Sequence, residues 1–125
     1  PLGRGILTGQ VQSTDSLGEA DIRRAHPRFR EENLGRNVEI VRALEVIASE
    51  KGCTTGQLSL AWLLAGGPDI VPIPGTKRRR YLEENIGAAE VVLTPDERDH
   101  LTALVPRDAI AGARYDDDEL ARVGL

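Results

Sequence analysis

The chain has 125 residues and a formal net charge of −4 at pH 7, from 16 Lys and Arg against 20 Asp and Glu. This acidic balance argues against a general nucleic-acid binder, which is usually basic over the whole domain. The single cysteine, Cys53, excludes an intrachain disulfide and a cysteine zinc cluster. No apolar run approaches the roughly 18 residues of a membrane span, so we expect one soluble, cytoplasmic unit.

The first part of the chain predicts a loop followed by an amphipathic helix. Residues 5–30 mix Gly, Ser, Thr, Asp and Pro without sustained periodicity, which is typical of a long loop. From Asn33 onward, apolar residues recur at steps of three and four as far as Gly52, with Glu and Arg between them. This spacing predicts a helix with one apolar face.

The middle of the chain predicts a buried helix and a short strand. Thr54 or Thr55 can cap a helix over 57–65, whose sequence QLSLAWLLA is apolar on nearly every side. Trp62 on this helix is expected in the core. The β-branched run DIVPI over 69–73 predicts an interior parallel strand, although its proline, Pro72, cannot donate a ladder hydrogen bond.

The block IPGTKRRRYLEEN, over 73–85, carries the strongest indication of function. An apolar run ends at a Pro-Gly-Thr turn, four cations follow, and a helix-like segment from about Arg79 to Ala88 contains Glu-Glu-Asn. Free backbone N–H groups and the dipole at a helix start favour an anion. The block therefore predicts a phosphate site for a phosphorylated cofactor. The alternative interpretation of the cations is a solvated helix start.

The last part of the chain predicts one more helix and a solvated tail. Thr94-Pro95-Asp96-Glu97 supplies an N-cap, a first-turn proline and acids at the positive end of a helix that reaches about Leu104. Residues 116–118 are all Asp, and we expect them in a solvated loop or a short helix. No repeat or low-complexity linker divides the chain, so residues 1–125 are expected to form one α/β unit.

Four segments, in this order, resemble the C-terminal part of aldo/keto reductases: PLGRGILTG at 1–9, the helix pair ending in QLSLAWLLA, IPGTKRRRYLEEN, and LTPDERDHL. The resemblance implies a (β/α)8 TIM barrel of about 250 residues, of which this chain supplies a mostly helical fragment, roughly the last third. It also implies NADPH as the cofactor and reduction of a small-molecule carbonyl substrate to an alcohol by hydride transfer.

The same resemblance implies that nine residues bind the cofactor. Carried over position by position, these are Leu2, Gly3 and Arg4 for the pyrophosphate, Gly75, Thr76 and Lys77 for the phosphate on the adenosine ribose, and Tyr81, Glu84 and Asn85 around the adenine. Glycine lets backbone approach a phosphate closely, and a hydroxyl with a cation supplies charge-assisted hydrogen bonds. Many relatives carry Lys where this chain has Gly75 and Arg where it has Tyr81, so Lys77 is expected to take over the cationic role.

No catalytic residue and no metal ligand is expected in this chain. The resemblance places the general-acid Tyr and its Lys, Asp and His partners upstream of Pro1, and neither His26 nor His100 matches a motif. The pair Arg114-Tyr115 resembles part of the family's tail that can border the substrate pocket, against the alternative of a surface loop. Two other functions stay open: a non-catalytic nucleotide-binding barrel module, and an anion or nucleic-acid binder that uses the basic turn.

Overall fold

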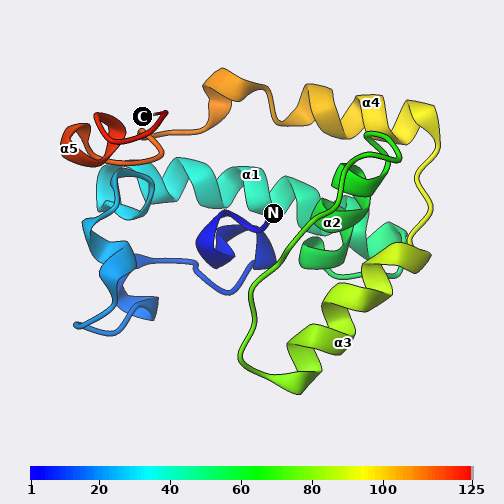
Figure 1. The fold of residues 1–125 in the computed structure, drawn as a ribbon, viewed down its shortest axis with the longest axis horizontal. Helices are drawn as coiled ribbons and strands as arrows, with labels where there is room; N and C mark the ends of the chain where they lie inside the picture. Colours follow the sequence, from blue (N-terminus) through cyan, green and yellow to red (C-terminus); the bar gives the residue numbers. More distant parts are fainter. Residues whose placement is uncertain (125) are drawn as a thin grey trace.

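The computed structural model describes residues 1–124, apart from the side chain of Arg107, and consists of helices joined by loops (Figure 1). The α-helices are α1 (Glu31–Glu50), α2 (Thr55–Leu64), α3 (Arg79–Gly87), α4 (Pro95–Leu104) and α5 (Asp117–Leu120). Short 3₁₀ turns cover Gly3–Thr8, Thr14–Ser16, Ile22–Ala25, Pro27–Phe29, Ala88–Glu90 and Arg107–Ala109. The long helix α1 lies across the middle, with α4 and α3 on opposite sides of it, and α2 contacts both α1 and α3 (Figure 1). The four longer helices are confirmed close to their predicted bounds, and the short helix expected in the acidic tail is α5.

The core forms along the predicted apolar face of α1. Its first half buries Leu34, Val38 and Val41 in one hydrophobic cluster, and its second half buries Leu44 and Ala48 in another. The second cluster is completed by buried leucines of α2 and α4, namely Leu58 and Leu101. Burial of these aliphatic side chains is the main force that holds the helices together.

The N-terminal segment contributes to the core, which the loop prediction did not include. Its short 3₁₀ turns and the loops between them insert four buried side chains into the first cluster of α1: Ile6, Val11, Leu17 and Phe29. Because these side chains come at irregular intervals, they produce no helical or strand periodicity in the sequence.

The strand predicted over residues 69–73 is wrong, because residues 1–124 contain no strand. The prediction that the chain is mostly helical is confirmed for these residues. The expected strand, residues 69–73, is instead part of the connection that passes the N-terminal turn on its way to α3 (Figure 1). A strand requires a hydrogen-bonded neighbour, and no described residue supplies one. Two prolines in this connection, Pro72 and Pro74, further reduce its capacity for pairing.

The expected burial of Trp62 is also wrong. The residue has a relative exposure of 38%, and its indole N–H donates to Thr102 Oγ1 of α4 at 3.0 Å. The amphipathic indole thus links two helices at the surface, since its N–H requires a polar partner. None of the helices among the described residues combines the length and apolar character needed to cross a membrane.

Candidate functional site

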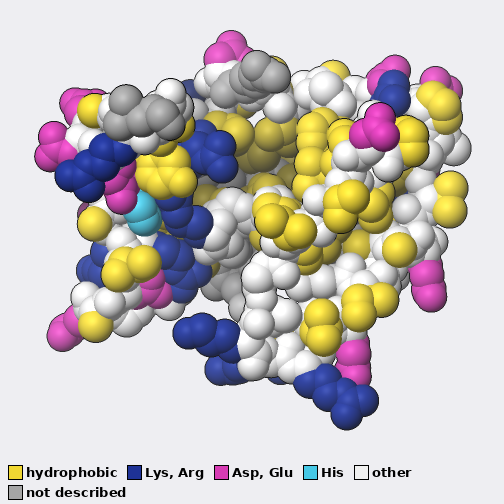
Figure 2. Space-filling view, viewed as in Figure 1, with side chains coloured by type: hydrophobic (Ala, Val, Ile, Leu, Met, Phe, Trp, Pro, Cys, Tyr) yellow, Lys and Arg dark blue, Asp and Glu magenta, His cyan; other side chains and the backbone are white. Residues whose placement is uncertain are grey.

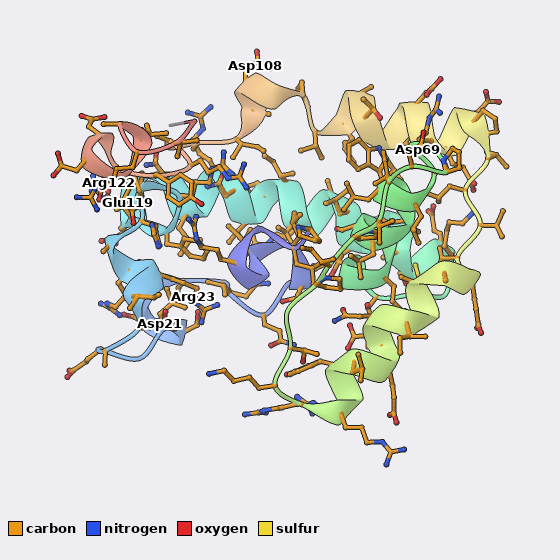
Figure 3. All side chains as sticks on the ribbon, viewed as in Figure 1. Asp21, Arg23, Asp69, Asp108, Glu119 and Arg122 are labelled. Carbon is orange, nitrogen blue, oxygen red and sulfur yellow. The ribbon has the colours of Figure 1, made fainter. Side chains whose placement is uncertain are left out.

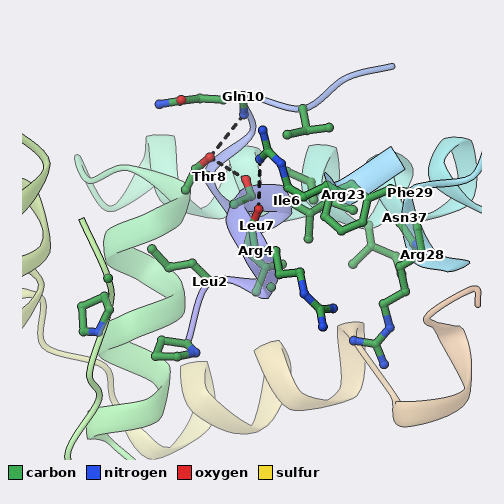
Figure 4. A pocket seen from close by; sticks show the side chains of 18 of the residues that line it. Leu2, Arg4, Ile6, Leu7, Thr8, Gln10, Arg23, Arg28, Phe29 and Asn37 are labelled. Carbon is green, nitrogen blue, oxygen red and sulfur yellow. Dashed lines mark hydrogen bonds between the residues drawn. The ribbon is translucent and has the colours of Figure 1, made fainter. Parts of the chain in front are cut away.

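A cleft of about 750 Å³ brings the ends of the chain together with its middle. Its walls come from the N-terminal turn, the segment before α1, α1, the turn before α3, α3 and the C-terminal tail. Figure 4 shows the part of the wall formed by the N-terminal turn, the segment before α1 and α1. Eight of the nine residues predicted to bind a cofactor line it: Leu2, Gly3, Arg4, Gly75, Thr76, Tyr81, Glu84 and Asn85. The ninth, Lys77, lies next to the cleft on the exposed turn before α3 and is not among its lining residues.

The N-terminal turn holds three successive residues in the left-handed conformation. The φ angles are 57° at Gly3, 57° at Arg4 and 93° at Gly5. A Cβ at Gly3 would lie 2.8 Å from Ile6 Cγ2, so this position has no room for a side chain. For Arg4 the conformation is uncommon and costs energy, and such local strain concentrates at functional sites.

Two arginines hold this turn in place. Arg23 Nη1 donates to the backbone carbonyl of Arg4 at 3.1 Å, and Arg4 Nη1 donates to the carbonyl of Arg114 at 3.1 Å. Arg23 is itself oriented by Asp21, whose carboxylate accepts from the guanidinium at 2.7–3.2 Å (Figure 3). These hydrogen bonds lower the pKa of Asp21 to about 2.

The turn before α3 is organised by Thr76. Its Oγ1 accepts from the backbone N–H of Arg78 at 3.2 Å. The same oxygen lies 3.2 Å from the Arg78 carbonyl oxygen, to which the hydroxyl donates. The side chain therefore fixes the backbone that leads from Gly75 into the helix.

The four cations after Thr76 differ in their partners. Arg79 bonds Glu83 at 2.8 Å, and Arg80 bonds the Tyr81 hydroxyl at 2.6 Å. The guanidinium carbon of Arg78 lies 6.0 Å from the centre of the Tyr81 ring. Lys77 forms no ion pair with any residue that the structure describes. Lys77 is therefore available to a ligand.

The three residues expected near adenine lie on the cleft side of α3. The Tyr81 hydroxyl is 3.4 Å from the side-chain amide of Gln10, and its hydrogen bond from Arg80, then that from Gln10, lower its pKa. Glu84 Oε1 accepts from the Thr54 hydroxyl at 2.8 Å, so this carboxylate also anchors α3 to the start of α2. Asn85 lines the cleft and is half-buried.

The structure adds cleft residues that sequence reasoning left without a role. Arg28 lies in the segment before α1, and burial, followed by the charges of Arg114 and Arg4, lowers its pKa. Arg114 and Tyr115, for which the sequence left open a border of the substrate pocket and a surface loop, also line the cleft. Nothing in the local sequence distinguishes Arg28 from the other arginines of this segment.

The second addition is Asn37, the buried amide of α1. It exchanges two hydrogen bonds of 2.9 Å with the backbone of Ala111 and donates to the carbonyl of Arg28 at 3.1 Å. The sequence did contain an indication of this role, because Asn37 stands on the apolar face between Leu34 and Val38. A buried polar side chain nearly always has hydrogen-bond partners.

The cleft is strongly basic although the whole chain is acidic. Four arginines line it, Arg4, Arg23, Arg28 and Arg114, against one carboxylate, Glu84. On the face shown in Figure 2, Lys and Arg side chains gather beside the hollow near the tail and again near the start of α3. The positive electrostatic potential that these side chains produce in the cleft favours an anionic ligand.

Comparison with known proteins identifies the family of the chain. The model of the aldo/keto reductase family matches residues 1–106 of the chain. The chain belongs to the aldo/keto reductase family. It is 50% identical over 115 residues to Aldo-keto reductase yakc (NADP(+)) of Schizosaccharomyces pombe, covering 92% of this chain and 34% of that protein. It is 44% identical over 114 residues to Aldo-keto reductase str7 of Strobilurus tenacellus, covering 91% of this chain and 34% of that protein. This aldo/keto reductase chain thus spans about a third of the length of these curated relatives.

Proposed function

We propose that this chain is the cofactor-binding part of a cytoplasmic, NADPH-dependent aldo/keto reductase, and that it completes a (β/α)8 barrel formed with further strands and helices. The observation that supports the proposal is the cleft, which gathers residues from positions 2–4 and 75–85. The relative from Schizosaccharomyces pombe carries NADP(+) in its name. When bound, NADPH supplies the hydride that reduces a small-molecule carbonyl to an alcohol.

The cleft residues fit a phosphorylated dinucleotide. The cleft volume of about 750 Å³ lies within the range of about 300–1,000 Å³ found for small-molecule sites. Leu2, Gly3 and Arg4 would hold the pyrophosphate, because the left-handed turn presents backbone without side-chain bulk at Gly3. At Gly75 a Cβ would meet no atom within 4 Å, so backbone there is open to a ligand.

The other predicted residues would hold the adenosine end of NADPH. Thr76 and Lys77 would bind the ribose phosphate through a hydroxyl and a free cation, since charge-assisted hydrogen bonds are stronger than neutral ones. Tyr81, Glu84 and Asn85 would border the adenine from α3. The Thr54–Glu84 hydrogen bond of 2.8 Å would orient the Glu84 carboxylate for this role.

The chain orients the cofactor and does not itself carry out the proton transfer. The resemblance assigns the general-acid Tyr and its partners to other strands of the barrel, so we propose that the isolated chain binds NADPH without reducing a carbonyl. The second candidate function is a nucleotide-binding barrel without catalysis, and the same cleft supports it. Carbonyl reduction by the longer protein that contains these upstream strands would decide between them.

The experiment that tests the proposed cofactor site is a titration with NADPH and NADH, followed by cofactor fluorescence. Lys77→Ala should weaken NADPH binding roughly tenfold or more, since hydrogen bonds to charged groups contribute about 1.5–3 kcal/mol. NADH affinity should change less than about twofold, because NADH lacks the ribose phosphate. The matched control is Arg79→Ala, which removes a cation already paired with Glu83.

Two results would contradict the proposed cofactor site. Equal losses of NADPH and NADH affinity in Lys77→Ala would show that the cation does not read the ribose phosphate. If the folded wild-type chain binds neither NADPH nor NADH, the cleft does not bind the cofactor. Circular dichroism of each variant establishes that its helices are intact before the titration.

A further inference from the structure

Three arginines from separate parts of the chain converge at the tail end of the cleft. Arg4 comes from the N-terminal turn, Arg28 from the turn Pro27–Phe29, and Arg114 from the tail. The guanidinium carbons of Arg4 and Arg114 lie 4.7 Å and 5.8 Å from the centre of the Tyr115 ring. Burial, followed by the charges of Arg114 and Arg4, lowers the pKa of Arg28. Figure 4 shows the side chains of Arg4 and Arg28 extending toward the same part of the cleft.

No acidic residue among those described neutralises this cluster. None of its three arginines forms an ion pair, whereas the neighbouring Arg23 is paired with Asp21. Glu119, on the adjacent helix α5, lies 3.6 Å from His26 instead. The carboxylate that lines the cleft, Glu84, accepts a hydrogen bond from Thr54 at the start of α2. The charges of Arg114 and Arg4 contribute to the lowered pKa of Arg28, so the three like charges repel one another and an anion would stabilise the cluster.

The cluster is held in place by the tail and keeps donors available. Arg4 donates to the carbonyl of Arg114 at 3.1 Å, and Arg28 donates through Nε to the carbonyl of Gly112 at 3.3 Å. A guanidinium has five N–H donors, and each of these hydrogen bonds uses one. The planar donors that remain suit a carboxylate, which accepts two parallel hydrogen bonds from an arginine.

The cluster lies apart from the turn that is proposed to bind the ribose phosphate. The ribose-phosphate turn lies at α3, on the other side of the molecule from the tail (Figure 1). The Tyr115 ring lies beside two of the arginines, and Phe29 and Ile110 also line the cleft. Building on the proposed reductase function, in which the backbone of Arg4 faces the pyrophosphate, we propose that the side chains of Arg28 and Arg114 bind the carboxylate of a carbonyl substrate whose body is apolar or aromatic. The Arg4 side chain lies beside them.

The test compares an acid with its uncharged ester. Isothermal titration calorimetry with saturating NADP(+) should show that 4-carboxybenzaldehyde binds at least tenfold more tightly than methyl 4-formylbenzoate. Arg114→Ala removes a charge without removing a side-chain hydrogen bond among the described residues, and it should abolish this preference. Arg114→Lys, which keeps the charge, should restore most of it. The matched control is Arg42→Ala, because Arg42 pairs with Glu39 on an exposed part of α1.

The following outcomes would overturn the proposed anion site or its assignment. Equal affinity for acid and ester, or the same effect of Arg114→Ala and Arg42→Ala, would show that the cluster does not read the carboxylate. Binding of the acid without NADP(+) that is lost in saturating NADP(+) would assign the arginines to the cofactor phosphates. A chain that prefers the acid but binds no NADPH would uphold the anion site and overturn both the reductase function and the substrate assignment. NADPH binding without preference for the acid would overturn the anion site alone.

Discussion

Asn37 is the residue on which the tail side of the cleft most depends. It is 4% exposed, and its amide satisfies both the N–H and the carbonyl of Ala111 while also donating to the carbonyl of Arg28. One side chain of α1 therefore positions the tail and the segment that carries Arg28. The contact with Ala111 joins residues 74 positions apart in the chain.

Replacing Asn37 with Leu should lower the free energy of unfolding by about 2–4 kcal/mol. Leucine preserves the packing volume, but the backbone groups of Ala111 lose their partners, and a buried unsatisfied group costs about 1–3 kcal/mol. Urea unfolding followed by circular dichroism measures the change. Glu39→Gln, on the exposed face of the same helix, should change stability by less than about 0.5 kcal/mol. A loss of stability in Asn37→Leu no larger than that of this control would contradict the account.

At the scale of single residues, the sequence predicted which residues line the cleft better than it predicted their backbone conformation. The resemblance to aldo/keto reductases implied nine cofactor-binding residues, and the structure places eight of them in one cleft. The left-handed conformation of Arg4 was not predictable, because hydrogen bonds from distant residues hold it. Cofactor binding by these residues stays a prediction.

Among the elements, the two capped helices were predicted best, because their ends are determined locally. Thr54 and Thr94 each accept from the backbone N–H three residues later, and Gln57 and Glu97 bond back to the cap residue. Such capping boxes satisfy two helix N–H groups that otherwise lack partners. The strand predicted at 69–73 was wrong because a strand depends on pairing with a neighbouring strand, which local sequence does not determine.

The two caps should differ in their contribution to stability. Thr94→Ala removes a capping hydrogen bond, which costs about 1 kcal/mol. Thr54→Ala removes a cap and also the hydrogen bond to Glu84, so we expect a loss of about 2 kcal/mol. Urea unfolding of the two variants gives the comparison. Equal losses would show that the Thr54–Glu84 contact contributes no stability and does not help to place α3.

For the molecule as a whole, the exposed apolar surface agrees with the proposal that the chain completes a larger barrel. Val71 and Ile73 of the connection before α3 are 78% and 82% exposed. Hydrophobic side chains are also visible across much of the face in Figure 2. The β-branched composition of this connection is typical of a strand, and it would acquire hydrogen-bonded neighbours inside a barrel.

The central claim is that the cleft binds NADPH, and amide NMR spectra of the chain titrated with NADPH test it most directly. We expect saturable shifts at Gly3 and Arg4, at Gly75 and Thr76, and at Asn85, while the outer face of α4 stays unchanged. That pattern would show that the two ends of the cleft act as one site, because their backbone groups would respond to the same ligand. Shifts centred outside the cleft, or no saturable shift in a folded chain, would contradict the account.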